Sequence, residues 1–470
     1  MISKKQLQVK DFFNCAKFYN YKLTKDKLLN ASGVSETVFP DSYENLNGNH
    51  INLYKSGINM GIDGIVYVKQ FYEDSGNTQH RFLVHAKNKK VYINQMFSQS
   101  YDMYWLYGLT FDSAPISLSF KKDGQDAVIL ASENEMKIWK TGYSPYDIPN
   151  APIITSMCVN DGVLFCTIKQ PAFKIWYATD LDAENVGNIS NTSGYISLED
   201  SLGNAGKVIT FNQDVYVFRE FGISKINFNK KEISVNQVYE SSTRIFTNTV
   251  SVCENSILFM TREGLCVFNG VKVKKMELSI PKMEILQNLT ATACSLEGKY
   301  YVSFPLNFND NKKILCEGDA YCKNNTLLIV DTDDFSYEVI RGVDIKSFVP
   351  MKNEYFEKMM VVYNSIDINC LSNISSENSG IFERILERYW ESNYLAEDAN
   401  LKVFTKLRVK ADKDVQFNIS FDDTTLSLTT YKSGVNEFFF KVYSKDIKIT
   451  IISKAKNSKV EEVVFDYYEE

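Results

Sequence analysis

A short polar turn followed by two apolar β-strands recurs along this chain from about residue 80 to residue 372. Alternating β-branched and aromatic side chains favour strands, and Asn, Asp and Gly favour tight turns. In the clearest copies the turns 160–162, 212–214 and 254–256 precede the strands 163–165 and 174–177, 215–218 and 223–226, and 257–260 and 265–268. Weaker copies pair 83–84 with 91–93, 128–130 with 136–139, 299–302 with 327–330, and 359–363 with 366–368.

A single hairpin of this kind cannot be stable alone, because two strands leave an apolar face and unpaired backbone groups in water. Neighbouring units must therefore stack on one another. Their spacing of roughly 35 to 60 residues is close to that of a four-stranded propeller blade. Radial stacking buries each face and leaves only short edges. We therefore expect an all-β fold, with a β-propeller of about six or seven degenerate blades over residues 51–372.

The segment 1–50 differs from the rest and is predicted to be a short N-terminal extension. Its apolar residues follow helical spacing, at Val9, Phe12, Phe13, Ala16 and Tyr19. Its charge is basic, with Lys4, Lys5, Lys10, Lys17, Lys22, Lys25 and Lys27 against Asp11 and Asp26. Two interpretations are open: an extension packed on the ring, or an arm that docks on an acidic neighbour.

Residues 373–470 are predicted to be a linker followed by an antiparallel β-sandwich. The stretch 372–380 is polar and rich in Ser and Asn, as linkers are. The runs beyond it alternate apolar and polar residues, at 401–404, 406–410, 415–421, 438–442, 447–452 and 460–468. Such alternation is typical of strands with one face in water. The charged run 383–391 has helical spacing, and we interpret it as a solvated face.

Composition limits the class of partner. The formal net charge of −6 argues against a dedicated DNA or RNA reader, whose nucleic-acid-binding domain would be strongly basic. A mildly acidic wall is compatible with a conduit past which nucleic acid slides, because it prevents the phosphates from sticking. The N-terminal residues show no secretory signal, and no stretch approaches the 18 apolar residues of a membrane span. We therefore expect synthesis in a cytoplasm.

Nine cysteines stand at positions 15, 158, 166, 253, 266, 294, 316, 322 and 370, mostly within apolar strand-like runs. We expect them to be buried free thiols. Cys316 and Cys322 lie in a more polar stretch and could bridge a loop, but without His partners they do not form a zinc site.

No motif for catalysis, cofactor binding or metal binding stands out. The three histidines, His50, His80 and His85, lie outside any nucleophile motif, and there is no glycine-rich phosphate loop. Asp331, Asp333 and Asp334 have the spacing of the first ligands in a calcium-binding loop. The glycine at the sixth position and the glutamate at the twelfth are missing, so a hairpin turn explains these residues. Asp422 and Asp423 also lie between two predicted strands, and a second hairpin turn explains them. We predict no enzyme, no cofactor, no catalytic or metal-binding residues, and we name no interaction residues.

Three stretches resemble the tail nozzle or packaged-DNA stabilisation proteins of short-tailed phages. They are the blade-like segments 207–226 and 249–270, and the approach to the terminal sandwich at 387–409. The resemblance implies a structural virion protein of the phage tail, forming a ring around the DNA exit path. It implies a cyclic homo-oligomer, a hexamer by tail symmetry, held by the portal or adaptor and other tail proteins. Packaged DNA would pass through the lumen without sequence-specific binding.

Two alternatives remain open at the level of sequence. A carbohydrate- or receptor-binding propeller of a tail fibre or baseplate would carry clustered exposed aromatic residues, because sugar rings stack on aromatic faces. A propeller glycoside hydrolase would place paired carboxylates across a central pocket. The sequence does not identify which carboxylates converge.

Overall fold

The computed structural model describes residues 4–9, 47–50, 62–72, 78–86, 88–94, 103–122, 125–133, 135–140, 144–179, 193–229, 232–276, 283–285, 290–308, 324, 326–333, 335, 337–341, 345–352, 357–365, 368–375, 388–392, 394–395, 400–422, 424–453 and 460–469. Within these ranges the secondary structure is β-strand, with no helix, so the predicted all-β class is confirmed. No helix in this part of the chain meets the length and apolarity needed to cross a membrane.

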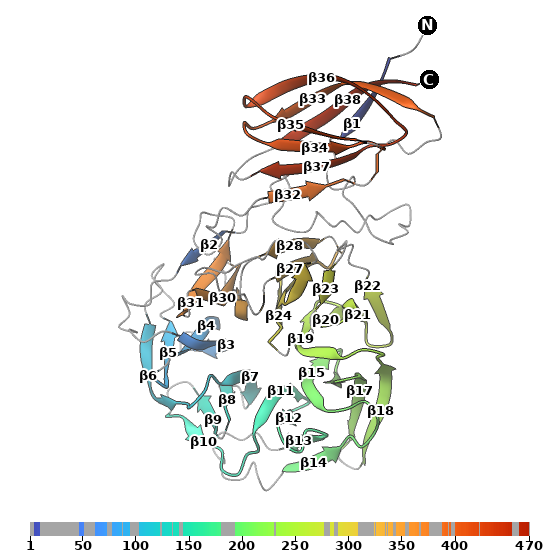
Figure 1. Ribbon diagram of the computed structural model, residues 1–470. Helices are drawn as coiled ribbons and strands as arrows, with labels where there is room; N and C mark the ends of the chain where they lie inside the picture. The colour runs from blue at the N-terminus through green and yellow to red at the C-terminus, as the bar shows by residue number, and fades with distance from the viewer. Residues whose placement is uncertain are drawn as a thin grey trace.

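Seven four-stranded antiparallel sheets are arranged in a ring (Figure 1). The first four contain β3 (Ile62–Tyr72), β4 (Thr78–Ala86), β5 (Lys90–Asn94) and β6 (Met103–Thr110); β7 (Ile116–Lys122), β8 (Gln125–Ala131), β9 (Met136–Lys140) and β10 (Tyr146–Asp147); β11 (Ile154–Asn160), β12 (Val163–Ile168), β13 (Lys174–Ala178) and β14 (Ser193–Ser197); and β15 (Ala205–Phe211), β16 (Asp214–Arg219), β17 (Gly222–Asn229) and β18 (Glu232–Glu240).

The fifth and sixth sheets contain β19 (Ile245–Cys253), β20 (Ser256–Thr261), β21 (Gly264–Phe268) and β22 (Val273–Met276), then β24 (Thr292–Leu296), β25 (Lys299–Phe304), β27 (Thr326–Asp331) and β28 (Tyr337–Arg341). The seventh contains β29 (Ile345–Lys352), β30 (Glu357–Ser365), β31 (Ile368–Ser375) and, from the N-terminal part of the chain, β2 (Asn47–His50). A separate pair joins β23 (Met283–Ile285) to β26 (Leu306–Phe308).

The ring is closed. The innermost strands contact one another in the order β3, β7, β11, β15, β19, β24 and β29, and β29 returns to β3. Strand β2 supplies the outer strand of the last sheet by pairing with β31, Asn47 opposite Ser375 and His50 opposite Ser372. Seven sheets closed in this way form a β-propeller, in agreement with the predicted fold class.

The repeat seen in the sequence corresponds to the second and third strands of each sheet. The run 163–165 lies in β12 and 174–177 in β13, and the other six copies map in the same way, to β4–β5, β8–β9, β16–β17, β20–β21, β25–β27 and β30–β31. In the last copy the second strand begins only at Ile368 and continues to Ser375. Second and third strands are the most apolar because they are covered on both faces by neighbouring sheets, as the buried patterns of β12 and β16 illustrate.

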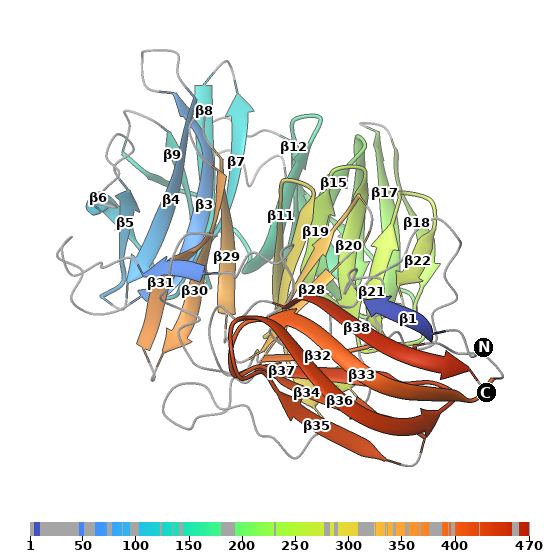
Figure 2. The same cartoon turned by 90° about the horizontal axis from the view of Figure 1, so that it is seen from above.

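The C-terminal part is a sandwich of two four-stranded sheets, as predicted. One sheet has the order β1-β38-β33-β36 and the other the order β32-β37-β34-β35. Their bounds are β1 (Lys4–Val9), β32 (Arg388–Glu391), β33 (Lys402–Ala411), β34 (Gln416–Ser420), β35 (Thr425–Thr429), β36 (Gly434–Ser444), β37 (Lys448–Ser453) and β38 (Val460–Glu469). Their inner faces form one core that includes Phe404, Phe417, Ile449 and Phe465. Figures 1 and 2 show the sandwich beside the ring, next to the sheet that contains β28.

Two predicted strands of the sandwich are a single strand. The runs 401–404 and 406–410 both lie in β33, whose pairing shifts register between Phe404 and Lys406. A bulge of this kind inserts one residue, here Thr405, and exchanges the faces of the strand. The apolar pattern is therefore interrupted although the strand continues.

The described parts of the N-terminal segment, residues 4–9 and 47–50, belong to two different units. Strand β1 pairs with β38 in the sandwich, and β2 pairs with β31 in the ring. Helical spacing is wrong for Val9, which lies in β1, and the other residues of that pattern lie outside the described residues. The basic character of the segment has a local partner: Lys4 lies 2.6 Å from Asp466, and Lys5 contacts Glu469.

Two further expectations need correction. The end of the charged run, Arg388–Glu391, is strand β32 and pairs with β37, so helical spacing is wrong there as well. The predicted linker begins later than residue 372, because Ser372 to Ser375 lie in β31. The remaining residues of both segments lie outside the described residues.

Candidate functional site

The innermost strands of the ring are joined to one another by side-chain hydroxyl groups. The Ser156 hydroxyl on β11 accepts from the Val208 amide of β15 at 3.1 Å, and Thr210 donates to the Val159 carbonyl at 2.9 Å. A similar bond joins the fifth and sixth sheets: the Ser295 hydroxyl on β24 donates to the Val252 carbonyl of β19 at 2.5 Å. Radially stacked sheets share no backbone ladder, so these hydroxyl bonds supply polar contacts between them.

Tyr300 makes a further link of this kind, from the second strand of the sixth sheet to the first strand of the fifth. Its side chain is fully buried, and its hydroxyl donates to the Thr249 carbonyl at 2.7 Å. Burial raises the pKa of the Tyr300 phenol well above its ordinary value. The group is therefore a neutral hydrogen-bond donor at physiological pH, and its role is to hold two sheets together.

Lys207, on an inner strand of the ring, is a lysine whose pKa is lowered by burial. It lies on the inner strand β15, and its ammonium is close enough to the Cys294 thiol of β24 and the Cys158 thiol of β11 for both to act on its pKa. Burial lowers that pKa from 10.5, and the two thiols oppose the shift only in part. Part of the residue's surface still reaches water. Among the described residues no carboxylate lies within ion-pair distance of it.

The inner strands are more basic than the chain as a whole. As the structure describes them, the seven strands contain six lysines and one aspartate, although the whole chain carries a net charge of −6. The lysines are Lys69, Lys121, Lys122, Lys207, Lys346 and Lys352, and the aspartate is Asp63. The acidity of the chain therefore resides outside the strands that surround the propeller axis.

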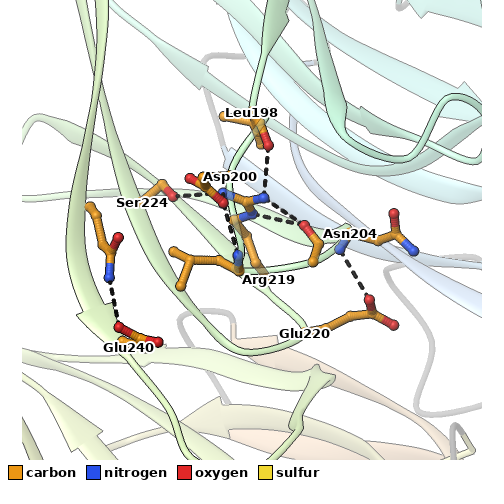
Figure 3. Close-up of polar contacts among 10 residues, drawn as sticks. Leu198, Asp200, Asn204, Arg219, Glu220, Ser224 and Glu240 are labelled. Carbon is orange, nitrogen blue, oxygen red and sulfur yellow. Dashed lines mark hydrogen bonds and ion pairs between the residues drawn. The ribbon is translucent and has the colours of Figure 1, made fainter.

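A buried arginine fixes the crossing from the third sheet to the fourth (Figure 3). Arg219, at the end of β16, is fully buried; its guanidinium donates to the Leu198 carbonyl at 2.9 Å and to the Gly203 carbonyl at 2.6 and 3.0 Å. Its Nη1 lies 2.5 Å from the Asp200 carboxylate and 3.5 Å from the Ser224 hydroxyl. All these acceptors belong to the chain itself, so the arrangement stabilises the loop rather than offering a free cation to a ligand.

The neighbouring carboxylate, Glu220, is occupied in the same way. It accepts from the Asn204 amide at 3.1 Å and pairs with Arg244 at 2.7 Å. Gly203 has a φ of +79°, and a Cβ added there would meet the Glu220 side chain, so both the conformation and the space favour glycine. The cluster therefore has the character of a loop anchor.

The residues considered as site candidates from the sequence make hydrogen bonds to the backbone of the fold. His85 is buried on β4, and its Nε2 lies 2.8 Å from the Phe111 carbonyl. Asp331 ends β27 and Asp333 lies in the turn toward β28, where the Asp331 carboxylate accepts from the Asp333 amide at 3.0 Å, as predicted for a hairpin. Within the described ranges no group of three or more His, Cys, Asp or Glu residues has metal-binding geometry.

The described thiols are free, as expected. Cys158, Cys166, Cys253 and Cys266 are buried and Cys294 is half-buried. Burial raises the pKa of Cys158 and Cys253 to about 12 and that of Cys266 and Cys294 to about 11. Such thiols are inert at neutral pH. The loop with Cys316 and Cys322 lies outside the described residues.

A surface that the sequence did not reveal lies on the outer face of the sandwich. Its members come from β36: Val435 is 46% exposed, Phe439 75% and Tyr443 47%. Lysines accompany them, with the Lys406 ammonium 5.2 Å from the Phe439 ring and the Lys441 ammonium 5.4 Å from the Tyr443 ring. Exposed aromatic residues in such a row are unusual on a monomer, so this row is a candidate interaction surface.

No family model matches the sequence, and no curated protein matches it. Many solved structures match in shape. The BBS1N chain of a complex with ARL6DN has 10% identity and a TM-score of 0.46, with 71% of this chain and 98% of that chain covered. The extracellular domain of the putative one component system BT4673 from B. thetaiotaomicron has 12% identity and a TM-score of 0.48, and this chain spans 59% of its length. Similarity at this level carries no argument about function.

Proposed function

We propose that this protein is a structural component of a phage tail, a ring-forming nozzle or hub protein that retains packaged DNA and forms part of its exit channel. The observation that carries the proposal is the double closure by one N-terminal segment. Strand β2 completes the seventh sheet of the ring, and β1 completes the edge of the sandwich. One segment is then held in both units by strand-to-strand backbone hydrogen bonds, which suits a component of a rigid assembly.

The channel of the proposed function lies between copies and not through one propeller. The innermost strands of neighbouring sheets contact one another all the way round the ring, so only seven strands surround the propeller axis. Seven strands in mutual contact, with side chains that point toward the axis, leave too little room for a DNA duplex. The wall of the lumen would therefore be made from outer surfaces of several copies arranged around a common axis, a cyclic homo-oligomer in contact with the portal or adaptor.

Analysis of purified particles tests this proposal. Mass spectrometry of the virions should detect the chain in several copies per particle, and antibody labelling should place it at the tail. The matched control is the same analysis of tailless heads, from which the chain should be absent. A chain that is abundant in infected cells and missing from purified particles would contradict the proposal.

A second candidate function is recognition of a receptor or a carbohydrate. The exposed rings of Phe439 and Tyr443 favour it, because aromatic faces exposed to water can stack on sugar rings. Binding to a glycan array that disappears when Phe439 or Tyr443 is changed to Ala, with the fold intact by circular dichroism, would support this function. Unchanged array signals in both variants would exclude this surface as a carbohydrate site.

A further inference from the structure

The edge of the sandwich sheet formed by β36 is open. β36 pairs with β33 on one side, and no described strand pairs with its other side. The strand has 11 residues, Gly434–Ser444, and contains no proline. A long unpaired edge presents free backbone N–H and C=O groups and is a template for a further strand, so proteins normally shorten, cover or charge such edges. Figures 1 and 2 show this edge on the side of the sandwich away from the ring.

The outward face of β36 has a regular sequence of side chains. Exposed and half-buried or buried residues alternate along the whole strand, and the exposed set is Val435, Glu437, Phe439, Lys441 and Tyr443. The register shift opposite Phe404 and Lys406 does not interrupt this alternation. The five outward residues therefore stand in one row, with Phe439 in the middle.

This row is complementary to itself when two copies run antiparallel. Placing Phe439 opposite Phe439 of the second copy puts Val435 opposite Tyr443 and Glu437 opposite Lys441. Aromatic, aromatic–aliphatic and opposite-charge pairs are the cross-strand pairs that stabilise antiparallel sheets. Because the same patch meets itself, the contact has two-fold symmetry. We propose that two copies of this chain pair through their β36 edges and form one continuous eight-stranded sheet.

The ionic contacts within one copy leave room for this pairing. Glu437 already accepts from Lys406 at 2.6 Å, and its second oxygen can accept from a further ammonium. Lys441 lies over the Tyr443 ring, and among the described residues it has no carboxylate within ion-pair distance. Glu437 of the second copy would supply that carboxylate. Phe439, at 75% exposure, would be covered by its counterpart.

The inference is independent of the proposed tail function. A two-fold contact joins copies in pairs, whereas a ring around DNA needs head-to-tail contacts made by other surfaces. If the chain does not dimerise through β36, it can still be a component of the particle. If it is absent from particles, it can still dimerise through β36.

Charge exchange at one pair tests the contact. Sedimentation velocity of the purified full-length chain over a concentration series should show a species of twice 53.9 kDa. Lys441→Glu places two like charges opposite each other twice per dimer, and the dissociation constant should rise roughly tenfold. The double variant Glu437→Lys with Lys441→Glu restores opposite charges and should recover most of the affinity. Recovery would not occur if the single change acted through folding.

A cysteine at the two-fold axis tests the register. In this pairing the two Cβ atoms at position 439 lie about 4.5–5.5 Å apart, within reach of a disulfide after small adjustment. Phe439→Cys should therefore give a disulfide-linked dimer under mild oxidation, beyond any background of the unaltered chain. Val271→Cys is the matched control, because Val271 is 79% exposed in a turn of the fifth sheet, and it should remain unlinked.

Three results of these experiments would each overturn the inference, and a fourth comes from the glycan array. The three are a chain that stays monomeric up to high concentration, an assembly whose dissociation constant is the same in all charge variants, and equal cross-linking at positions 439 and 271. Glycan binding at Phe439 by a monomeric chain would also overturn it, and would assign the surface to a sugar.

Discussion

The Arg219 guanidinium lies 2.5 Å from the Asp200 carboxylate and, through two carbonyl acceptors, holds the loop that leads from the third sheet of the ring to the fourth. The loop contains Leu198 and Gly203 and runs from the outer strand β14 of the third sheet to β15, the strand that pairs with β16. One fully buried side chain therefore fixes the relation between two neighbouring blades.

Replacing this arginine should destabilise the ring strongly. Arg219→Met leaves the carbonyls of Leu198 and Gly203 without their donor in a buried place, and we expect a loss of about 3 kcal/mol in the free energy of unfolding. Equilibrium unfolding in urea checks this value. Lys272→Met, in an exposed turn, is the control and should change the free energy by less than about 0.5 kcal/mol. Equal effects of the two changes would show that the cluster has no anchoring role.

Acid should release the N-terminal strand. Burial raises the pKa of Asp466, but hydrogen bonds from Lys4 and Gln6 outweigh it, and the pKa lies below 3.8. The ionised carboxylate therefore stabilises β1 above pH 3.8, and the contribution is lost as the pH falls through the lowered pKa. Asp466→Asn should remove it at every pH.

Hydrogen exchange in Lys4–Val9 provides the measurement. The amides of β1 should exchange faster at neutral pH in Asp466→Asn than in the unaltered chain, whereas those of β37 should not change. Asp414→Asn, in an exposed turn, serves as the control. Unaltered protection of β1 in Asp466→Asn would mean that its backbone pairing with β38 suffices.

Lys207 should be a source of instability at neutral pH. Burial lowers its pKa from 10.5, so between the lowered pKa and 10.5 the unfolded chain binds more protons than the folded chain. Stability contributed by this group therefore rises with pH across that window and is lowest below it. Lys207→Met should raise the free energy of unfolding at pH 7 by about 1 kcal/mol.

The advantage of that variant should shrink as the pH approaches 10.5. Urea unfolding at several pH values gives the free energy of unfolding of the unaltered chain and of Lys207→Met as a function of pH. Lys299 is exposed on β25, so Lys299→Met is the control. A variant less stable than the unaltered chain at pH 7 would indicate that the ammonium has a stabilising partner.

The buried thiols should resist alkylation. Burial raises the pKa of Cys158 and Cys253 to about 12, so almost no thiolate exists at pH 8. Iodoacetamide should label these residues, and Cys166, Cys266 and Cys294, only after the chain is denatured. Peptide mass spectrometry before and after denaturation distinguishes the sites. Rapid labelling of Cys158 in the native chain would mean that the inner strands open readily.

The hairpins of the ring were predictable because their signals are local. Turn residues such as Asp161 and Asn212 adopt positive φ, of 47° and 50°, which Asn and Asp tolerate better than most residues. The strands next to these turns are covered on both faces and are therefore strongly apolar. The first strand of each sheet was harder to recognise, since β24 consists of half-buried residues and has no contrast between its faces.

The N-terminal strands and the outer surface of the sandwich could not be predicted in this way. The partners of β1 and β2, strands β38 and β31, lie hundreds of residues away in the chain, and no turn connects them. Short apolar patterns such as that around Val9 fit a helix or a strand until the partner is known. In the row centred on Phe439, three consecutive phenylalanines at 438–440 interrupt the contrast between the two faces, so the sequence does not indicate that the Phe439 ring is exposed.

Electron cryo-microscopy of intact particles tests the central claim most directly. The account predicts several copies of this chain around the DNA path at the tail, each a closed ring of seven four-stranded sheets with a sandwich at its side. DNA density should run between the copies and not along any propeller axis. Particles that lack the chain, or an isolated copy bound away from the DNA path, would contradict the account.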